Sequence, residues 1–463
     1  MIKPLTLKWV EEFIAARKPL RAVTAKCQQG DAEFTAVSID TRTLKEGELF
    51  VALRGERFDA HDFIQDAVAK KPCALVVERF FPEISLPQLV VSDSLLALGQ
   101  IAALNRSLFA RPIIAITGSS GKTTVKTLLA GILAECGPTH ATKGNFNNHV
   151  GVPLTLLQLD AQHEYAVIEM GASGPGEIEY LCSLATPQIT MINNVMAAHI
   201  QGFGSIQGVA RAKGEIYAAL PGTGIAVVNM DDRFAPDWLA SLTNRRVIRV
   251  SLQDTSADCF AQDIQASANS LEFSINLNGQ ATQVSLNAQG EHNIRNALMA
   301  AACASAVGAD LQKIKQGLAS FAPVSGRMSR HVGVNDAAII DDSYNANPGS
   351  VRAAIDVLAQ KTNSILVLGD LGELGPEAAQ LHAELGEYAR AKKLSHLFTV
   401  GKLSENASKA FGADAIHFAD KATLVAHLKS IANKNTTILI KGSRSAAMDT
   451  VVRELCNSAG DNH

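Results

Sequence analysis

An apolar segment that runs into a glycine-rich loop and then into a helical segment constrains this chain most. In PIIAITGSSGKTTVKTLL, the run PIIAIT predicts a buried strand, and the residues after Gly-Lys predict a helix. Small residues in such a loop let backbone N–H groups turn toward phosphate oxygens, and the helix N-terminus adds a favourable dipole. The three parts together predict a P-loop within a parallel α/β sheet.

Each residue type in this loop has a role toward a nucleotide. Lys122 can reach the β and γ phosphates, and the Thr123 hydroxyl can bind magnesium. The loop has the short form T-G-x-x-G-K-T, because Ile116 stands where the pattern G-x-x-x-x-G-K-[ST] has glycine. A glycine-rich turn that only caps a helix is the alternative, which the position of Gly-Lys-Thr at the strand-to-helix boundary disfavours. The predicted nucleotide-binding residues are Gly118, Ser119, Ser120, Gly121, Lys122, Thr123 and Thr124.

Length and pattern predict a three-domain α/β protein. At ~100 to 200 residues per domain, 463 residues correspond to about three domains. Short strand-like runs such as FTAVSI characterise residues 1–88. Residues 89–321 alternate buried runs such as YAVIEM with helical segments, and residues 322–463 repeat that alternation. We expect a small N-terminal α/β domain, a central doubly wound P-loop domain with a mostly parallel sheet, and a C-terminal Rossmann-like α/β domain.

Composition disfavours several classes of function. The chain is 47% hydrophobic and 19% charged with a formal net charge of -3, and it lacks the excess of Lys and Arg expected of a nucleic-acid binder. Its seven cysteines contain no C-x-x-C pair, so neither a disulfide framework nor a cysteine zinc site is indicated, and a cytoplasmic location fits best. No stretch reaches the ~18 apolar residues of a membrane span. We therefore expect no signal peptide and no integral membrane association.

Polar residues after two predicted strands are candidate metal ligands. Glu169 ends YAVIE and His199 follows ITMINNVMAA, at the sheet edge where doubly wound folds bind ligands. A carboxylate suits Mg²⁺, whereas a His ligand suggests a second divalent site. From the residues alone, a hydrogen-bonded structural role is the more common one for a histidine such as His199, and a solvated helix surface is the better interpretation of Lys213. The intervening glycines miss the dinucleotide pattern G-x-G-x-x-G by one residue, so we expect a loop at Gly202, Gly204 and Gly208.

Longer motifs in a fixed order resemble the Mur ligase family of ATP-dependent amide ligases. TGSSGKTT, EMGAS, AHIQGFGS and AKGEIY occur in the order of that family, followed by GEHNIRNALMAA, SGRM and DDSYNANPGS. Three further segments, SIDTRTLKEGELFVALRGERFDAHDF, KGNFNNHVGVPLTLL and ILIKGSRSAAM, resemble the members that join D-alanyl-D-alanine to UDP-N-acetylmuramoyl-tripeptide. The resemblance spans nearly the whole chain. Ala60 departs from it, since those members have glycine there.

The resemblance implies ATP and two Mg²⁺ ions as cofactors. It implies that Lys122 contacts the γ phosphate and that Thr123 and Glu169 bind the first ion. A carbamylated Lys213 and His199 would lie at the second ion. Lys122, His199 and Lys213 are thus the implied catalytic residues.

The resemblance also implies where each substrate binds. Residues 1–88 would bind the UDP end of the tripeptide substrate, residues 89–321 ATP, and residues 322–463 the dipeptide, in a monomeric enzyme. The implied nucleotide contacts outside the P-loop are Asn293, Asn296, Arg327 and Asp342. The implied substrate contacts are Ser38, Asp40, Thr41, Arg42, Asn145, Asn147, Asn148, Asn345 and Asn347. Structural roles remain an alternative for these residues, because Asn and Asp often cap helices and turns.

Three alternative functions remain open from the sequence. The chain could be the sister Mur ligase that adds the third amino acid, a folylpolyglutamate synthase with the same core, or a P-loop regulator that hydrolyses ATP without ligation. The motifs NANP and KGSR disfavour the first two, whereas the P-loop alone is equally good support for the third. The sequence does not specify whether the tripeptide carries lysine or diaminopimelate.

Overall fold

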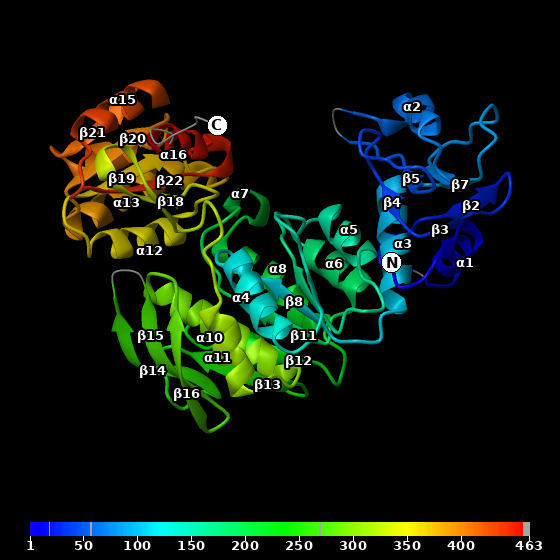
Figure 1. Ribbon diagram of the computed structural model, residues 1–463, viewed down its shortest axis with the longest axis horizontal. Coiled ribbons are helices and arrows are strands. Elements are labelled where there is room, and N and C mark those ends of the chain that lie inside the picture. Colours follow the sequence, from blue (N-terminus) through cyan, green and yellow to red (C-terminus); the bar gives the residue numbers. More distant parts are fainter. Residues whose placement is uncertain (18, 56–57, 268–269, 457–463) are drawn as a thin grey trace.

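Three large sheets, each flanked by helices, organise the computed structural model, which describes residues 1–17, 19–55, 58–267 and 270–456. Figure 1 shows them as three bodies that follow one another along the chain, coloured blue, cyan to green, and yellow to red. No helix in these residues combines the length and apolar character needed to cross a bilayer. All seven cysteines are free thiols, as their spacing predicts.

The N-terminal sheet has five strands in the order β2-β7-β6-β5-β4. Strand β2 is antiparallel to β7, and the other neighbours are parallel. A separate two-stranded ladder joins β1 to β3. The strands are β1 (Leu5–Thr6), β2 (Ala25–Gln28), β3 (Glu33–Phe34), β4 (Val37–Ser38), β5 (Leu49–Val51), β6 (Ala74–Val77) and β7 (Gln88–Val91). The helices are α1 (Leu7–Arg17), the 3-10 helix η1 (Ala60–Phe63) and α2 (Ile64–Ala69).

Helix α3 (Ser94–Ser107) connects this sheet to the central one. Asp93 caps its amino end by accepting a hydrogen bond from the Leu96 backbone N–H at 2.8 Å. The apolar face of α3 packs into a cluster shared with both sheets, so the two bodies have one continuous core here. The boundary predicted at residue 88 falls at the start of β7, which pairs with both β2 and β6. We propose that the N-terminal domain extends to Val91.

The central sheet has nine strands in the order β16-β15-β14-β13-β12-β11-β8-β10-β9. Strands β8 to β14 are all parallel to one another. Strand β15 then pairs antiparallel with β14, and β16 pairs antiparallel with β15. The inner strands are apolar along their length because helices cover both faces of a parallel sheet. Helices α4, α10 and α11 pack on one face, and α5, α6 and α8 pack on the other.

The bounds of the central elements follow chain order. The strands are β8 (Ile113–Thr117), β9 (Thr139–Ala141), β10 (Tyr165–Glu169), β11 (Ile189–Ile192), β12 (Ile225–Asn229), β13 (Arg246–Ser251), β14 (Cys259–Ala266), β15 (Leu271–Leu277) and β16 (Gln280–Leu286). The helices are α4 (Lys122–Ala134), α5 (Gly151–Leu157), α6 (Glu177–Ala185), α7 (Ile200–Phe203), α8 (Ile206–Ala218), α9 (Ala235–Ser241), α10 (Glu291–Ala306) and α11 (Leu311–Ala319).

The glycine cluster after β11 is not the loop that the sequence predicted. Gly202 lies in α7, Gly208 lies in the first turn of α8, and only Gly204 lies between the helices. A Cβ at Gly202 would lie 2.0 Å from the Ser173 carbonyl oxygen. Such glycines permit close backbone packing, which the pattern of spacing alone does not reveal.

The C-terminal sheet has six strands in the order β17-β18-β22-β19-β20-β21, all parallel except β17. Its strands are β17 (Ser329–Val332), β18 (Ala338–Asp342), β19 (Ser364–Gly369), β20 (His396–Val400), β21 (Ala415–Phe418) and β22 (Thr437–Lys441). Its α-helices are α12 (Pro348–Leu358), α13 (Ala378–Ala391), α14 (Glu405–Phe411), α15 (Lys421–Ile431) and α16 (Asp449–Cys456). Its 3-10 helices are η2 (Val334–Asp336), η3 (Gly375–Glu377) and η4 (Arg444–Ala446).

The predicted fold class, three α/β units with mostly parallel sheets, is confirmed. Helices again cover both faces of the C-terminal sheet, with α12, α13 and α14 on one side and α15 and α16 on the other. The carboxyl ends of β8, β10 and β11 meet at one edge of the central sheet, and those of β18, β19 and β22 meet at one edge of the C-terminal sheet. Residues after all six strands line one cleft. In parallel α/β sheets, this edge is where ligands bind.

Candidate active site

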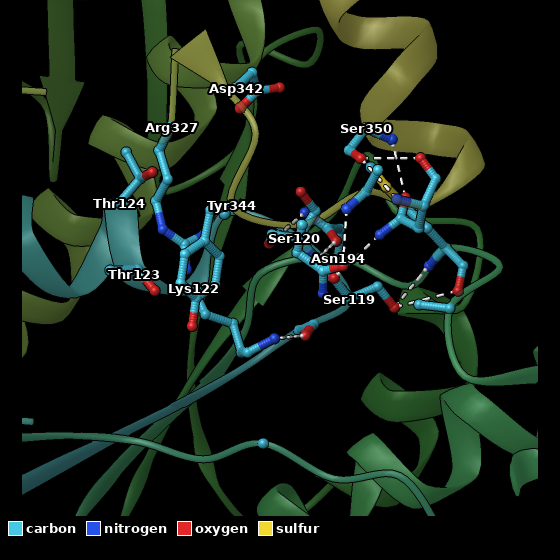
Figure 2. A pocket seen from close by; sticks show the side chains of 18 of the residues that line it. Ser119, Ser120, Lys122, Thr123, Thr124, Asn194, Arg327, Asp342, Tyr344 and Ser350 are labelled. Carbon is cyan, nitrogen blue, oxygen red and sulfur yellow. Dashed lines mark hydrogen bonds between the residues drawn. The ribbon is translucent and has the colours of Figure 1, made fainter. Parts of the chain in front are cut away.

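A cleft of about 640 Å³ lies between the central and C-terminal sheets. Figure 2 shows the P-loop side chains on one side and residues from the C-terminal domain opposite them. Almost all of the predicted site residues line this cleft: Gly118, Ser119, Ser120, Gly121, Lys122, Thr123, Thr124, Asn145, Asn147, Asn148, Glu169, His199, Lys213, Asn293, Asn296, Arg327, Asp342, Asn345 and Asn347.

The P-loop backbone needs glycine at two positions. Gly121 has φ +75°, and a Cβ there would lie 2.5 Å from Asn193 Nδ2 and 2.8 Å from Asn296 Oδ1. Gly118 has φ +154°, and its Cβ would lie 3.0 Å from the Cβ of Asn193. Lys122, the first residue of α4, donates from Nζ to the Gly118 carbonyl at 2.8 Å. The loop therefore forms a tight cradle of backbone N–H groups that side chains would obstruct, which suits phosphate oxygens.

A network of asparagine side chains from α10 and from the segment after β11 supports the P-loop through hydrogen bonds. Asn193 donates from Nδ2 to the Ser120 carbonyl and to Asn296 Oδ1, both at 2.9 Å. Asn194 accepts the Ser120 backbone N–H at 2.9 Å, and Asn296 donates to Asn293 Oδ1 at 3.0 Å. Asn293 and Asn296 therefore support the loop through Asn193. Sequence reasoning missed Asn193 and Asn194, although they lie within the apolar run QITMINNV and directly follow β11.

Thr123, in the first turn of α4, lies beside Glu169, which ends β10. Thr123 Oγ1 donates to Glu169 Oε2 at 3.0 Å, and Asn147 Nδ2 donates to Glu169 Oε1 at 2.8 Å. Hydroxyl and carboxylate oxygens are the ligands that Mg²⁺ prefers, usually with waters and phosphate oxygens completing its coordination. No group of three His, Cys, Asp or Glu residues suited to a metal occurs in the described ranges. This pair thus fits an ion held partly by a bound phosphate.

A buried lysine that sequence reasoning missed stands beside Glu169. Lys126 lies one helical turn after Lys122, and its Nζ is 3.1 Å from Glu169 Oε2 and 2.9 Å from the Gly144 carbonyl. Burial alone would raise the pKa of Glu169, but Lys126 and Lys122 hold that pKa below its usual value. Glu169 is therefore an ionised carboxylate although only 1% of it is exposed.

Lys213 is not the solvated surface lysine that its spacing suggested. It lies on α8 with only 2% of its surface exposed, and it faces the cleft. Burial, together with the nearby charge of Lys122, lowers the pKa of Lys213 to about 7. A large fraction of this side chain is consequently a neutral amine near pH 7, which is uncommon for lysine.

His199 caps the amino end of α7 in a left-handed conformation with φ +54°. Its Nδ1 lies against the carboxylate of Glu373, which belongs to the loop after β19. Burial lowers the pKa of His199, while Glu373 opposes this shift. Sequence reasoning missed Glu373, which is far from His199 in the chain.

The C-terminal domain contributes a cation stacked on an aromatic ring. The Arg327 guanidinium carbon lies 4.2 Å from the centroid of the Tyr344 ring, and Figure 2 shows both side chains facing the P-loop helix. Asp342 ends β18 and accepts a hydrogen bond from Lys441 Nζ at 2.5 Å. Burial raises the pKa of Asp342 despite this lysine. Tyr344 and Lys441 lie within the motifs DDSYNANPGS and ILIKGSRSAAM, but no role was predicted for either residue.

Asn345 and Asn347 make different contacts. Asn347 caps α12, since its Oδ1 accepts the Ser350 backbone N–H at 2.9 Å in a reciprocal capping box. Its Nδ2 also donates to the Ser119 carbonyl at 3.3 Å, across the cleft. Asn345 Oδ1 accepts the Arg444 backbone N–H at 3.3 Å. The predicted capping role of Asn347 is therefore confirmed, and its predicted role toward a substrate stays a prediction.

Four predicted substrate residues lie outside the cleft. Ser38 ends β4 in the N-terminal domain, and Asp40, Thr41 and Arg42 follow in one turn. Asp40 accepts hydrogen bonds from the Arg42 side chain, the closer at 2.6 Å, which lowers the pKa of Asp40 to about 2. The structure brings these residues together on a different domain from the P-loop.

Comparisons with known proteins identify what this arrangement is similar to. Three domain models match: the Mur ligase family catalytic domain at residues 33–106, the Mur ligase middle domain at 116–304, and the Mur ligase glutamate ligase domain at 326–444. The chain is 45% identical over 436 residues to the UDP-N-acetylmuramoyl-tripeptide–D-alanyl-D-alanine ligase of Escherichia coli (strain K12), which covers 94% of this chain and 96% of that relative.

Two crystal structures extend this similarity to three dimensions. MurF from Acinetobacter baumannii is 34% identical with a TM-score of 0.89, over 98% of this chain and 99% of that chain. The MurF ligase from Thermotoga maritima in complex with ADP is 26% identical with a TM-score of 0.81, over 90% and 96% of the two chains. The similarity thus includes all three domains.

The buried Lys213 generates a prediction about stability and pH. The pKa of Lys213 is about 7 in the folded chain, whereas that of an unfolded lysine is about 10.4. Between these two pH values, the folded chain therefore binds fewer protons than the unfolded chain. Wild-type stability should therefore rise with pH across this window, and the destabilisation is largest at or below pH 7. Lys213→Met should be more stable than wild type at pH 7, and this advantage should shrink by roughly 2 kcal/mol by pH 9.

Urea unfolding at pH 7, 8 and 9 in CO₂-free buffer measures the difference. Lys315→Met, at an exposed lysine on α11, is the matched control. Identical pH dependence in the two variants would contradict a buried neutral amine.

Proposed function

This chain belongs to the Mur ligase family, and we propose that it uses ATP to join D-alanyl-D-alanine to UDP-N-acetylmuramoyl-tripeptide in peptidoglycan precursor synthesis. The observation that carries this proposal is the single cleft in which a P-loop and the Tyr344–Asn347 loop face each other. The identity of 45% over 94% of the chain favours this function over the sister ligase and the folylpolyglutamate synthase.

The chemistry of amide formation requires an activated carboxylate. A carboxylate at neutral pH repels nucleophiles, and its oxygen is a poor leaving group. We propose that the terminal carboxylate of the tripeptide attacks the γ phosphorus of ATP, giving an acyl phosphate and ADP. The neutral amine of the dipeptide then attacks the acyl carbon, and inorganic phosphate leaves from the tetrahedral intermediate as the amine loses its proton.

The residues of the P-loop would reduce the repulsion between the two reacting anions, the tripeptide carboxylate and the γ phosphate of ATP. Lys122 would contact the γ phosphate, and the backbone N–H groups of residues 118–121 would hold the β phosphate. Thr123 and Glu169 would hold Mg²⁺, which supplies positive charge to the phosphates when bound. Lys126 adds a further buried cation next to this pair.

A second ion would be held by His199 and a carbamylated Lys213. Carbamylation needs a neutral amine, whose nitrogen attacks CO₂ and releases a proton, and the lowered pKa of Lys213 supports this reaction. The product is an anionic oxygen ligand in place of a cation, so the local charge changes from positive to negative. Both side chains line the same cleft as Glu169.

The remaining substrate contacts follow the same division of domains. We propose that Ser38, Asp40, Thr41 and Arg42 contact the UDP end and that Asn145, Asn147 and Asn148 extend that site toward the P-loop. Arg327 and Asp342 would reach the nucleotide, which Asn293 and Asn296 would support. The domains would then be residues 1–91, 92–321 and 322–463. We further propose a cytoplasmic location, which the cysteine pattern led us to expect, and a monomeric enzyme.

A phosphate-release assay tests the function. Phosphate should appear only when ATP, the UDP-muramoyl tripeptide and the dipeptide are all present. With ¹⁸O in the terminal tripeptide carboxylate, one labelled oxygen should leave in the phosphate. Turnover without the dipeptide would favour a P-loop regulator, and unlabelled phosphate would exclude the acyl phosphate.

Removal of the Glu169 carboxylate should change the magnesium dependence of ligation. At ~1 mM Mg²⁺, Glu169→Gln should lower kcat roughly 100-fold or more, because an amide binds Mg²⁺ weakly and leaves Lys126 without its partner. Higher Mg²⁺ should restore part of the rate by mass action. Initial rates across a magnesium series measure this effect. Glu164→Gln, at the exposed residue just before β10, is the control, and an unchanged magnesium profile in Glu169→Gln would rule out the ligand role.

Loss of the Asn345 amide should weaken dipeptide use selectively. An amide has donors and an acceptor but no charge, so it suits a neutral peptide group. Asn345→Ala should raise the KM for D-alanyl-D-alanine roughly 2- to 13-fold, the equivalent of about 0.5 to 1.5 kcal/mol, and leave the KM for ATP unchanged. Steady-state kinetics with each substrate varied in turn check this. Asn435→Ala, in an exposed turn of the same domain, is the control, and an equal rise in both constants would argue for a structural role.

A further inference from the structure

The contact between His199 and Glu373 joins two domains. His199 precedes α7 in the central domain, and Glu373 lies in the loop after β19 in the C-terminal domain. The Glu373 carboxylate lies against His199 Nδ1, and the Glu373 carbonyl accepts the Gln201 backbone N–H at 3.3 Å. The same two segments are therefore connected through a side chain and through the backbone.

Both residues of the pair have an unusual backbone conformation. His199 has φ +54° and Glu373 has φ +61°, in the left-handed region that few non-glycine residues adopt. Gly372 precedes Glu373 and Gly375 lies two residues after it, yet the chain carries a long carboxylate at this position. Such conformations persist where surrounding contacts determine them, and they cluster at functional sites.

The charges around His199 explain why a carboxylate would be placed there. Lys122 is a cation close enough to act on the imidazole, and Glu373 is the anion that acts on it. Glu373 also lines the cleft, and its side chain is more than half exposed. It is therefore available both to the histidine and to the cleft.

The two nitrogens of an imidazole have distinct roles. A carboxylate that accepts a hydrogen bond from Nδ1 fixes the tautomer and leaves the Nε2 lone pair for a metal ion. Carboxylate, histidine and metal in this order form a common arrangement in metalloproteins, in which the carboxylate orients the ligand.

We propose that Glu373 is a positioning residue that orients His199 through Nδ1, so that the C-terminal domain contributes to the second divalent-cation site. This inference rests on the proposed function, in which His199 and Lys213 hold a second ion. It assigns to Glu373 an indirect role through its contact with Nδ1, in contrast to a direct ligand, whose charge would be needed. It also links the strength of cation binding to the contact between the two domains.

Binding of Mn²⁺ to the full-length enzyme tests the inference without ligation. Electron paramagnetic resonance of free Mn²⁺, with saturating ADP present, counts the bound ions and gives their affinities. Wild type should bind two ions, and His199→Gln should weaken only the second. Glu169→Gln should weaken the first, which assigns the two classes of site.

Two variants of Glu373 that differ by one methylene separate positioning from charge. Glu373→Gln keeps the length of the side chain and an oxygen that can accept a hydrogen bond from Nδ1. Glu373→Asn is one carbon shorter and cannot reach, while asparagine tolerates the left-handed backbone. Glu373→Asn should weaken the second Mn²⁺ by roughly 10- to 100-fold and Glu373→Gln by much less, with the first ion unchanged in both. Glu377→Gln, at the exposed last residue of η3, which follows this loop, is the control.

Three outcomes would overturn the inference. The second ion could bind to Glu373→Asn as tightly as to wild type, or Glu373→Gln could be as impaired as Glu373→Asn, which would mean that the charge itself is needed. Wild type could also bind one ion only. In that last case, ligation by the same preparation would show that the proposed function stands while this inference fails. Circular dichroism of each variant establishes that it is folded.

Discussion

The buried carboxylate of Glu169 is the interaction on which the rest of the site depends. An ionised carboxylate that is 1% exposed is unfavourable unless charges and hydrogen bonds replace its water. Its partners come from separate segments: Thr123 and Lys126 from α4, and Asn147 from the loop before α5. Their contacts fix the P-loop helix, that loop and β10 relative to one another. A carboxylate needed for chemistry thus also determines local structure.

The P-loop also depends on close packing with residues from other segments. The asparagines after β11 approach so closely that Gly121 has no room for a Cβ, and in return they satisfy the backbone of Ser120. Asn296 then supports Asn193 from α10, which packs on the same face of the sheet as α4. A substitution in α10 would therefore act on phosphate binding without touching a phosphate. Such an effect is conformational, whereas loss of Lys122 would remove charge directly.

The sequence predicts the parallel strands, the P-loop and the strand-end residues well, because each depends on neighbours in the chain. Apolar runs predict that β8, β10 and β11 are buried, and Gly-Lys-Thr predicts the turn into α4. Lys126, Asn193 and Glu373 were missed because each acquires its role from a segment far away in sequence. Lys213 shows why local spacing is not enough to predict burial. Its position on a helix suggested an exposed lysine, but the packing of α8 buries it. We propose a first domain boundary after Val91 in place of the predicted residue 88, because β7 pairs with β2 and β6, and such pairing over a distance in the chain is not visible in the sequence.

Division of the site between two sheets follows from the chemistry that the cleft would support. An acyl phosphate hydrolyses readily, so it has to meet an amine before water does. The central sheet supplies cations and backbone N–H groups for phosphate, and the C-terminal sheet supplies neutral amides, Tyr344 and Arg327. Asn347 and Glu373 cross the cleft to Ser119 and His199, respectively. These two contacts lie on the phosphate side and on the proposed second-cation side, so they constrain the C-terminal domain at two separate points. A rotation of that domain would disturb both at once, and the geometry for attack on the acyl carbon is thereby tied to the geometry that stabilises the phosphate charge.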